Sequence, residues 1–208
     1  MVFSSQVFLF YFLPVFLIGY FVLVWRGVRH SYLNLFITIF SYIFYGWMEP
    51  WLIVLMFSST TIDYIAGRFI SAEGASQRQR NIALTASIVA NLSTLGFFKY
   101  YMFFMGGLNA ILSKFGLDTF SVWNVILPVG ISFYTFQSMS YTIDVWRGVA
   151  PPAKNLATFS CYVALFPQLV AGPIVRYNTV AEELASRKHS MDLFLKGITF
   201  FCIGFAKK

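Results

Sequence analysis

Ionisable side chains inside apolar segments are the first residues that could do chemistry. Asp63 and Lys99 lie within long apolar runs, and Asp144 stands three residues before Arg147. A charge in hydrocarbon is costly, so it usually marks a functional path or a polar contact between helices. For Asp63, both a structural hydrogen bond and a functional role stay open. Lys99 beside Tyr100 is typical of a lysine that reaches the interface, and Asp144 can pair with Arg147 on one helix face.

A second set of polar residues follows Gly130 at helical spacing, inside an otherwise apolar segment. A period of 3.6 residues places these side chains on one side of a helix. Such a stripe either lines a polar tunnel or holds transmembrane helices together through small and hydroxylic groups. The stripe consists of Tyr134, Gln137, Ser138, Tyr141 and Asp144.

Other common catalytic patterns are missing from the sequence. There is no Walker loop, no GxGxxG and no metal-ligand spacing, so we predict no metal site. His30 and His189 lie in basic loops, where we expect them to face solvent or lipid headgroups. Cys161 and Cys202 both lie in apolar stretches, and we expect two buried free thiols rather than a disulfide.

The composition indicates that most of the outer surface of the protein faces lipid. Of the 208 residues, 58% are hydrophobic and only 11% are charged, whereas a soluble domain carries about 25% charged residues. A water-facing surface cannot be made from so few charged residues. We therefore expect the lipid bilayer to be the first partner of this protein. The net charge of +7 does not indicate nucleic-acid binding, because the cations lie in short gaps between apolar runs, as the positive-inside rule predicts.

The elements that must position these residues are membrane helices. A helix needs about 20 apolar residues to cross a hydrocarbon core of about 30 Å. We therefore predict an all-α, polytopic membrane helix bundle, with Pro14 tolerated in its first helix and a loop or surface helix at residues 106–121. The candidate membrane segments are residues 7–25, 31–47, 51–70, 82–105, 122–146, 157–175 and 191–206.

The loop charges predict the orientation. Arginine and lysine concentrate in the first, third and fifth loops, which places those loops in the cytoplasm and the N-terminus outside. A full crossing by residues 157–175 would put later cations outside. That segment is interrupted by Pro167, Gly172 and Pro173. We therefore favour a re-entrant segment there, with a kinked spanning helix as the alternative.

Four stretches together resemble the membrane-bound O-acyltransferase family, above all its polysaccharide-acetylating members. The likeness covers all 208 residues in order. The stretches are MVFSSQVFLFYFLP (residues 1–14), LGFFKYYMFF (95–104), LPVGISFYTFQSMSYTIDVWRG (127–148) and FPQLVAGPIVRY (166–177).

The resemblance implies a bacterial inner-membrane enzyme, of which residues 1–208 are the N-terminal part. It would take an acetyl group from acetyl-CoA or another acyl thioester, with no bound cofactor, and pass it across the membrane. The expected recipients are an alginate-like exopolysaccharide or a periplasmic acetyltransferase partner. The two stretches that begin at residues 127 and 166 are expected to line the cavity. The candidate cavity-lining residues are therefore the polar stripe together with Gln168 and Arg176.

The resemblance assigns no catalytic residue in this chain. The histidine that would act as general base on the accepting hydroxyl belongs to a later membrane segment of the family, beyond Lys208. Neither His30 nor His189 matches its position. Two alternatives stay open: a transporter-like subunit, which broken helices and intramembrane charges also suit, and an inactive or partner-binding truncated chain.

Overall fold

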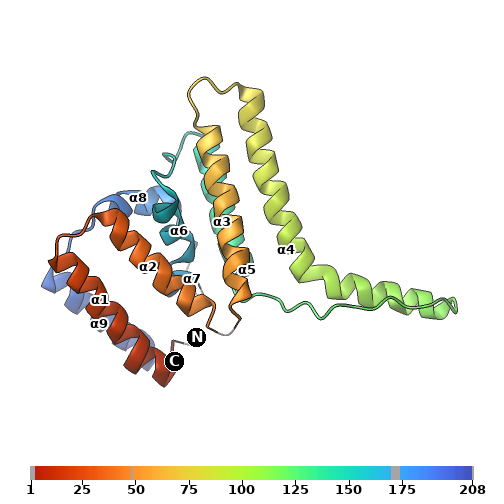
Figure 1. Cartoon of the computed structure of the whole chain (residues 1–208), viewed down its shortest axis with the longest axis horizontal. Coiled ribbons are helices and arrows are strands. Elements are labelled where there is room, and N and C mark those ends of the chain that lie inside the picture. The colour runs from red at the N-terminus through yellow and green to blue at the C-terminus, as the bar shows by residue number, and fades with distance from the viewer. Residues whose placement is uncertain (1–2, 48, 170–173, 208) are drawn as a thin grey trace.

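A computed structural model describes residues 3–47, 49–169 and 174–207, and among these it contains helices and loops but no strand. The all-α bundle expected from the sequence is therefore confirmed (Figure 1). The helices are η1 (Phe8–Phe12), α1 (Leu13–Trp25), α2 (His30–Tyr45), α3 (Trp51–Ile70), α4 (Gln77–Lys114), α5 (Ile131–Trp146), α6 (Leu156–Ala164), α7 (Phe166–Leu169), α8 (Tyr177–Ala185) and α9 (Met191–Ala206).

Three of the described helical stretches are long and apolar enough to cross a membrane, which makes this a membrane protein. They are Phe8–Trp25, Trp51–Ile70 and Gln77–Lys114. With 16 residues each, α2 and α9 reach about 24 Å at 1.5 Å per residue. Neither α6 nor α7, with 9 and 4 residues, is long enough to cross a bilayer of about 30 Å by itself.

The first helix accommodates Pro14 by widening the turn before it. Proline has no N–H to donate and its ring crowds the preceding turn. Residues Phe8–Phe12 form a π-helix, and the Leu13 N–H bonds to the Phe8 carbonyl, five residues back. The chain then continues as a regular α-helix to Trp25.

Side-chain caps and one glycine begin the helices that form the core. Ser76 and Gln79 form a reciprocal capping box at the start of α4. Asn155 accepts a hydrogen bond of 2.8 Å from the Thr158 N–H at the start of α6. Gly130, with φ of 78°, precedes α5 in the left-handed region, which glycine enters at low cost.

The expectation of a loop or surface helix at residues 106–121 fits the mostly exposed helix and loop found there, but the expectation of a helix from residue 122 is wrong. Helix α4 continues through residue 106 to Lys114, and residues 122–130 are non-helical, so α5 starts only at Ile131. Figure 1 shows the end of α4 and the returning chain projecting from the bundle as an arm, here defined as residues 106–128. Asn109 holds the arm together, because its side chain makes two hydrogen bonds of 2.9 Å with the backbone of Phe120.

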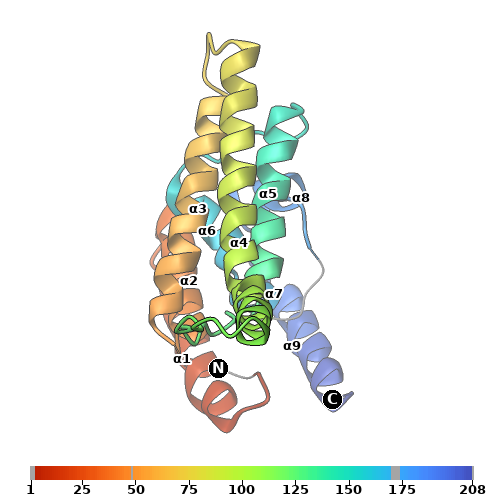
Figure 2. The same ribbon diagram turned by 90° about the vertical axis from the view of Figure 1, so that its right-hand side faces the viewer.

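Helices α3, α4 and α5 pack side by side, and α6 packs against α2 and α3 (Figure 2). The chain descends through α6 and α7 and comes back to α8. Figures 1 and 2 show α8 near the end of the bundle where α6 begins. The re-entrant path of residues 157–175 stays a prediction. Its breakers Gly172 and Pro173 lie outside the described residues, and Pro167 lies in α7.

The two thiols differ in burial. Both are free, as expected, but only Cys161 is buried, whereas Cys202 is exposed. The expectation of a buried Cys202 is wrong because α9 contributes no buried residue to the described bundle. Lys99 is exposed, and its Nζ lies 5.5 Å from the centre of the Tyr100 ring, an arrangement that suits a lysine at the interface.

Candidate functional site

The polar stripe expected on residues 131–146 is buried between helices. Tyr134, Gln137, Ser138, Tyr141 and Asp144 are each at most 5% exposed, and their helix α5 packs on α3, α4 and α6. None of the five lines the pocket described below. This packing favours the helix-association interpretation, and the tunnel-lining role stays a prediction.

Gln137 and Tyr141 connect α5 to the segments beside it. The Gln137 amide donates to the Tyr162 carbonyl of α6 at 2.9 Å. The Tyr141 hydroxyl accepts from the Ala153 N–H at 3.0 Å. A Cβ added at Gly67 would lie 2.5 Å from that hydroxyl. Glycine at position 67 therefore lets α3 approach the Tyr141 ring.

Asp63 is the centre of a buried polar cluster between α3 and α4, in which its Oδ2 has no hydrogen-bond partner. Its Oδ1 accepts hydrogen bonds from the Ser87 hydroxyl at 2.6 Å and the Asn91 amide at 2.7 Å. The Asn91 Oδ1 in turn accepts from the Ser59 hydroxyl at 2.8 Å. Asp63 itself is completely buried. These contacts give Asp63 the helix-to-helix hydrogen bonds that were one of its two predicted roles.

The expected pair of Asp144 and Arg147 is not formed. No ion pair within 4.0 Å joins any described side chains of this protein. Asp144 is 5% exposed and its Oδ2 has no partner, whereas Arg147 is exposed at the end of α5. The Asp144 carbonyl instead accepts from the N–H groups of Val149 and Ala150, because the chain turns there at Gly148, with φ of 72°.

Gln168 and Arg176 belong to other elements than the stripe on α5. Gln168 is half-buried in the short helix α7, and Arg176 is exposed as the N-cap of α8. Neither lines the pocket described below. Their predicted place in a shared cavity with α5 stays a prediction.

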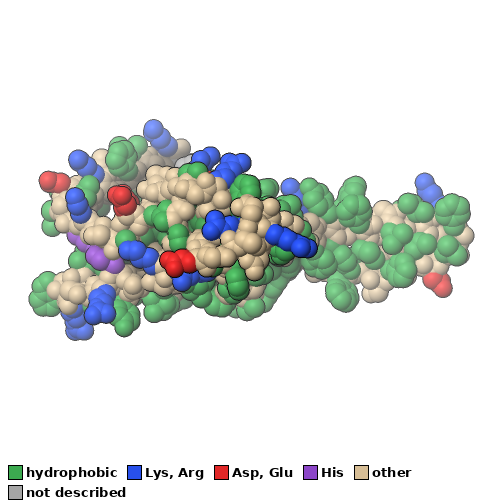
Figure 3. All heavy atoms as spheres, turned by 90° about the horizontal axis from the view of Figure 1, so that it is seen from above, with side chains coloured by type: hydrophobic (Ala, Val, Ile, Leu, Met, Phe, Trp, Pro, Cys, Tyr) green, Lys and Arg blue, Asp and Glu red, His purple; other side chains and the backbone are tan. Residues whose placement is uncertain are grey.

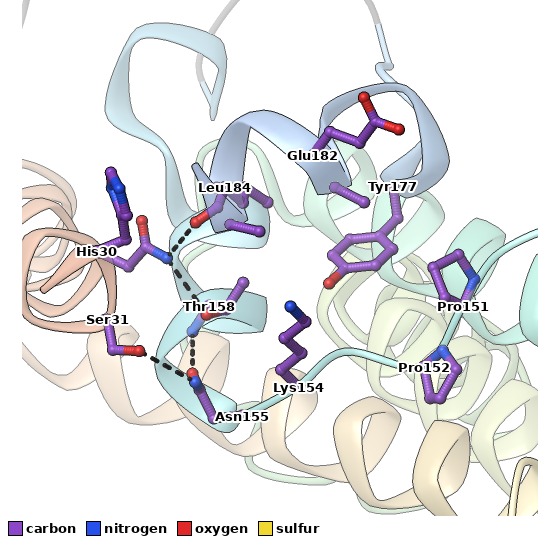
Figure 4. A pocket seen from close by; sticks show the side chains of 13 residues that line it. His30, Ser31, Pro151, Pro152, Lys154, Asn155, Thr158, Tyr177, Glu182 and Leu184 are labelled. Atoms are coloured by element: carbon purple, nitrogen blue, oxygen red, sulfur yellow. Dashed lines mark hydrogen bonds between the residues drawn. The ribbon is translucent and has the colours of Figure 1, made fainter. Parts of the chain in front are cut away.

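A pocket lined by several kinds of polar side chain lies at the end of the bundle where α2 and α6 begin (Figure 4). Its volume is about 360 Å³, within the usual range for ligand sites. Elements far apart in sequence meet here: the start of α2, residues 151–155, α6 and α8. It is lined by His30, Ser31, Asn34, Pro151, Pro152, Lys154, Asn155, Thr158, Tyr177, Ala181, Glu182, Leu184 and Ala185.

Asn34 holds the walls of this pocket together. Its amide nitrogen donates to the Leu184 carbonyl of α8 at 2.9 Å and to the Thr158 hydroxyl of α6 at 3.2 Å. Asn34 is 1% exposed, and its Oδ1 has no hydrogen-bond partner. Buried polar groups are nearly always paired. The Asn34 Oδ1 is therefore a buried, unpaired acceptor behind the pocket wall.

Tyr177 forms the base of the pocket. Its ring lies edge-on to Tyr141, with 5.0 Å between centres, and close to Tyr162 at 5.2 Å. Burial, and then the neighbouring Tyr141, raise the pKa of Tyr177 to about 12. At neutral pH its hydroxyl is therefore a neutral hydrogen-bond donor and not a base. Figure 4 shows this hydroxyl and the Lys154 side chain on the same side of the pocket.

This end of the molecule is basic. Figure 3 looks onto it and shows lysine and arginine side chains spread over the bundle, whereas the projecting arm is mainly hydrophobic. His189 lies near His30, as an exposed side chain whose Nε2 is 2.9 Å from the Tyr20 hydroxyl. Among the described residues, no group of three or more His, Cys, Asp or Glu side chains could hold a metal ion.

Sequence reasoning missed this pocket. Its parts were visible only singly: Lys154 in a loop, His30 in a basic loop, and Asn34 as a polar residue in an apolar run. Asn34 follows His30 by four residues, so both lie on one face of α2. That spacing of four residues was the signal in the sequence from which part of the pocket could have been predicted. The contribution of α6 and α8 could not be found from it.

The chain is similar over its whole length to proteins that acetylate polysaccharides. It is 44% identical to "Probable alginate O-acetylase AlgI" of Pseudomonas aeruginosa and 43% identical to the protein of that name from Azotobacter vinelandii. It is also 27% identical to the "Peptidoglycan O-acetyltransferase" of Helicobacter pylori. All three matches cover 100% of this chain, but only 39%, 41% and 44% of the relatives.

The chain thus spans about two fifths of the length of these curated relatives, and it matches their N-terminal part. The resemblance to polysaccharide-acetylating proteins predicted from four stretches is confirmed. No protein-family model matches the chain, and no solved structure matches it.

Proposed function

We propose, from its similarity to the alginate O-acetylases, that this chain is the N-terminal membrane part of an O-acetyltransferase of the membrane-bound O-acyltransferase family. The observation that carries the proposal is 44% identity over every residue of the chain to the N-terminal part of an alginate O-acetylase. The described helices supply a membrane scaffold of the kind that such an enzyme needs.

In this proposal the enzyme lies in the bacterial inner membrane with its basic end in the cytoplasm. There it takes an acetyl group from acetyl-CoA or another acyl thioester. It passes the group outward to an exopolysaccharide such as alginate or to a periplasmic acetyltransferase. The distribution of lysine and arginine supports this orientation, because cationic loops are retained in the cytoplasm.

The test is acetyl transfer across a bilayer. The longer protein that contains this chain is reconstituted in liposomes, with radiolabelled acetyl-CoA outside and an alginate oligosaccharide inside. The proposal predicts acetyl ester on the enclosed sugar and release of free coenzyme A. Transport of a substrate without ester formation would support a transporter instead, and neither result in a folded protein would contradict both functions.

A further inference from the structure

We propose that the projecting arm and the last turns of α4 lie flat in the membrane interface, at the end of the bundle opposite the basic end. One face of α4 would contact the hydrocarbon and the other the headgroup layer, so the partner is the phospholipid surface itself. The proposal goes beyond acetyl transfer, because it concerns how this chain contacts the membrane and is tested without any enzymatic reaction.

The depth of the arm in the membrane follows from the packing of α4 on α3. Helix α3 has 20 residues, so it is about 30 Å long, which equals the thickness of the hydrocarbon core. The Phe98 ring of α4 stacks on the ring of Trp51, the first residue of α3, with 5.9 Å between the ring centres. Because α4 starts beside the end of α3 and runs back along it, α4 has already crossed the core when it reaches Phe98.

The rest of α4 has no hydrocarbon core left to cross. Residues 99–114 add about 24 Å at 1.5 Å per residue. Figures 1 and 2 show this last part of α4 turned away from α3 and α5 and running sideways from the bundle. A helix that runs sideways at the level where its neighbour begins lies along the plane of the membrane.

This sideways part of α4 has an apolar face and a polar face. At about 100° per residue, four large apolar side chains fall within a sector of about 80°, and each is between 42% and 67% exposed. They are Tyr100, Phe104, Leu108 and Ile111. The other side carries small and polar residues, with Met102 and Phe103 as exceptions where the helix leaves the bundle. The small and polar residues are Lys99, Gly106, Ala110, Ser113 and Lys114.

The two-sided pattern favours a lipid surface over a protein partner. A helix that is enclosed by protein is hydrophobic all round, whereas an interfacial helix keeps its polar face among the headgroups. Lys99 and Lys114 stand at the two ends of this part of α4. Long lysine side chains can reach the headgroup phosphates from a helix that lies in the interface. The charges of this segment therefore complement a phospholipid surface.

The returning chain adds an aromatic residue to the same surface. Asn109 holds the backbone of Phe120, and the Trp123 N–H donates to the Tyr101 hydroxyl at 3.4 Å, so the returning chain follows α4. Trp123 is exposed, and tryptophan is enriched at membrane interfaces because its ring is amphipathic. Figure 3 shows mainly hydrophobic side chains over the arm. Helix and returning chain can therefore enter the interface as one unit.

The experiment measures the membrane depth of spin labels in the longer protein that contains this chain, reconstituted in phosphatidylcholine liposomes. Exposed cysteines, Cys202 included, are first replaced by serine. Single labels are then attached in Ile111→Cys, on the apolar face, and in Ala110→Cys, the adjacent exposed residue on the polar face. Collisions with O2, which dissolves in lipid, are compared with collisions with a water-soluble nickel chelate. A second pair, Leu108→Cys and Ser113→Cys, repeats the comparison in case one variant does not fold.

We expect the label at position 111 to lie about 5–10 Å below the headgroup phosphates, the usual depth of an interfacial apolar face, and to collide mainly with O2. The label at position 110 should collide mainly with the nickel chelate. Three results would overturn the proposal. An immobile label at 111, shielded from both reagents, would show a protein cover, either a later part of the longer protein or a partner. Equal access of the chelate to both positions would show an arm in water, and access of O2 alone to both would show an arm enclosed in hydrocarbon.

Discussion

Two buried asparagines, Asn91 and Asn34, make the same kind of contacts with opposite results. Each donates two hydrogen bonds from its amide nitrogen to groups on or beside its own helix. The Asn91 Oδ1 accepts from the Ser59 hydroxyl, so all the polar atoms of this side chain are paired. The Asn34 Oδ1 is buried and has no hydrogen-bond partner. The same residue type is thus fully paired in one region and keeps an unpaired, buried oxygen in the other.

The largest effect is expected from Asn91→Leu, which tests whether the polar cluster around Asp63 joins α3 to α4. The substitution removes a donor to the Asp63 carboxyl and leaves the Ser59 hydroxyl unpaired. Loss of one partner of a buried polar group costs about 1–3 kcal/mol each, so we expect about 3 kcal/mol in thermal or denaturant unfolding. Ser93→Leu, at an exposed site of the same helix, is the control. Equal losses in both variants would show that the cluster contributes nothing special.

The next effect comes from the close approach of α3 to α5. In Gly67→Ala the new Cβ would lie 2.5 Å from the Tyr141 hydroxyl, so the helices must move apart. Overpacking of this kind costs about 1–3 kcal/mol. Gly96→Ala, where a Cβ meets no atom within 4 Å, should be neutral or stabilising. Unfolding midpoints measured in one detergent compare the two, and a neutral Gly67→Ala would contradict the packing of Tyr141.

A smaller and more local effect is expected at the pocket. Asn34→Ala removes the contacts to Thr158 and Leu184, but it leaves no buried acceptor behind at position 34. We expect a loss of about 1 kcal/mol, with faster proteolysis near residues 185–190 because α8 is released. Limited proteolysis followed by mass spectrometry measures this. A global loss as large as that of Asn91→Leu would remove the distinction between the two regions.

The smallest effect is a pH dependence next to the pocket. Partial burial, and then nearby Arg187 and His30, lower the pKa of His189 below its ordinary 6.5. The unfolded chain therefore takes up this proton at a higher pH than the folded chain. The stability from the neutral imidazole is complete above pH 6.5 and falls as the pH drops below it. An NMR titration of the imidazole should give a midpoint below 6.5, and Arg187→Gln should raise it because a nearby positive charge is removed. A midpoint above 6.5 would contradict the burial of His189 and its position near these cationic groups.

Much of the scaffold follows from the sequence. The third apolar run coincides with helix α3 at Trp51–Ile70, because Pro50 and the polar loop after residue 70 limit it on both sides. The polar stripe on residues 131–146 does lie on one buried face, as a period of 3.6 requires. Hydrophobic periodicity is a local property, so it finds elements like these reliably.

The features that could not be predicted from the sequence depend on contacts between distant segments or on single backbone angles. Residues 122–130 are as apolar as a membrane helix, but they are non-helical, and the left-handed Gly130 comes directly before α5, which begins at Ile131. The pocket unites residues near positions 30, 154, 158 and 180, and no spacing rule connects them. Asp144 is buried against the neighbouring helices, whereas Arg147 is exposed at the C-cap of α5, so the spacing of three residues does not bring the two side chains together.

The measurement that tests the account most directly is labelling from one side of the membrane. In a background with Cys202→Ser, single variants Lys188→Cys and Lys114→Cys are treated with an impermeant maleimide, in spheroplasts and in inverted vesicles. The account predicts that position 188, at the basic end, reacts only in inverted vesicles, and that position 114, at the end of α4, reacts only in spheroplasts. The reverse pattern would place the basic end and its pocket outside, away from cytoplasmic thioesters, and would contradict the proposed direction of acetyl transfer.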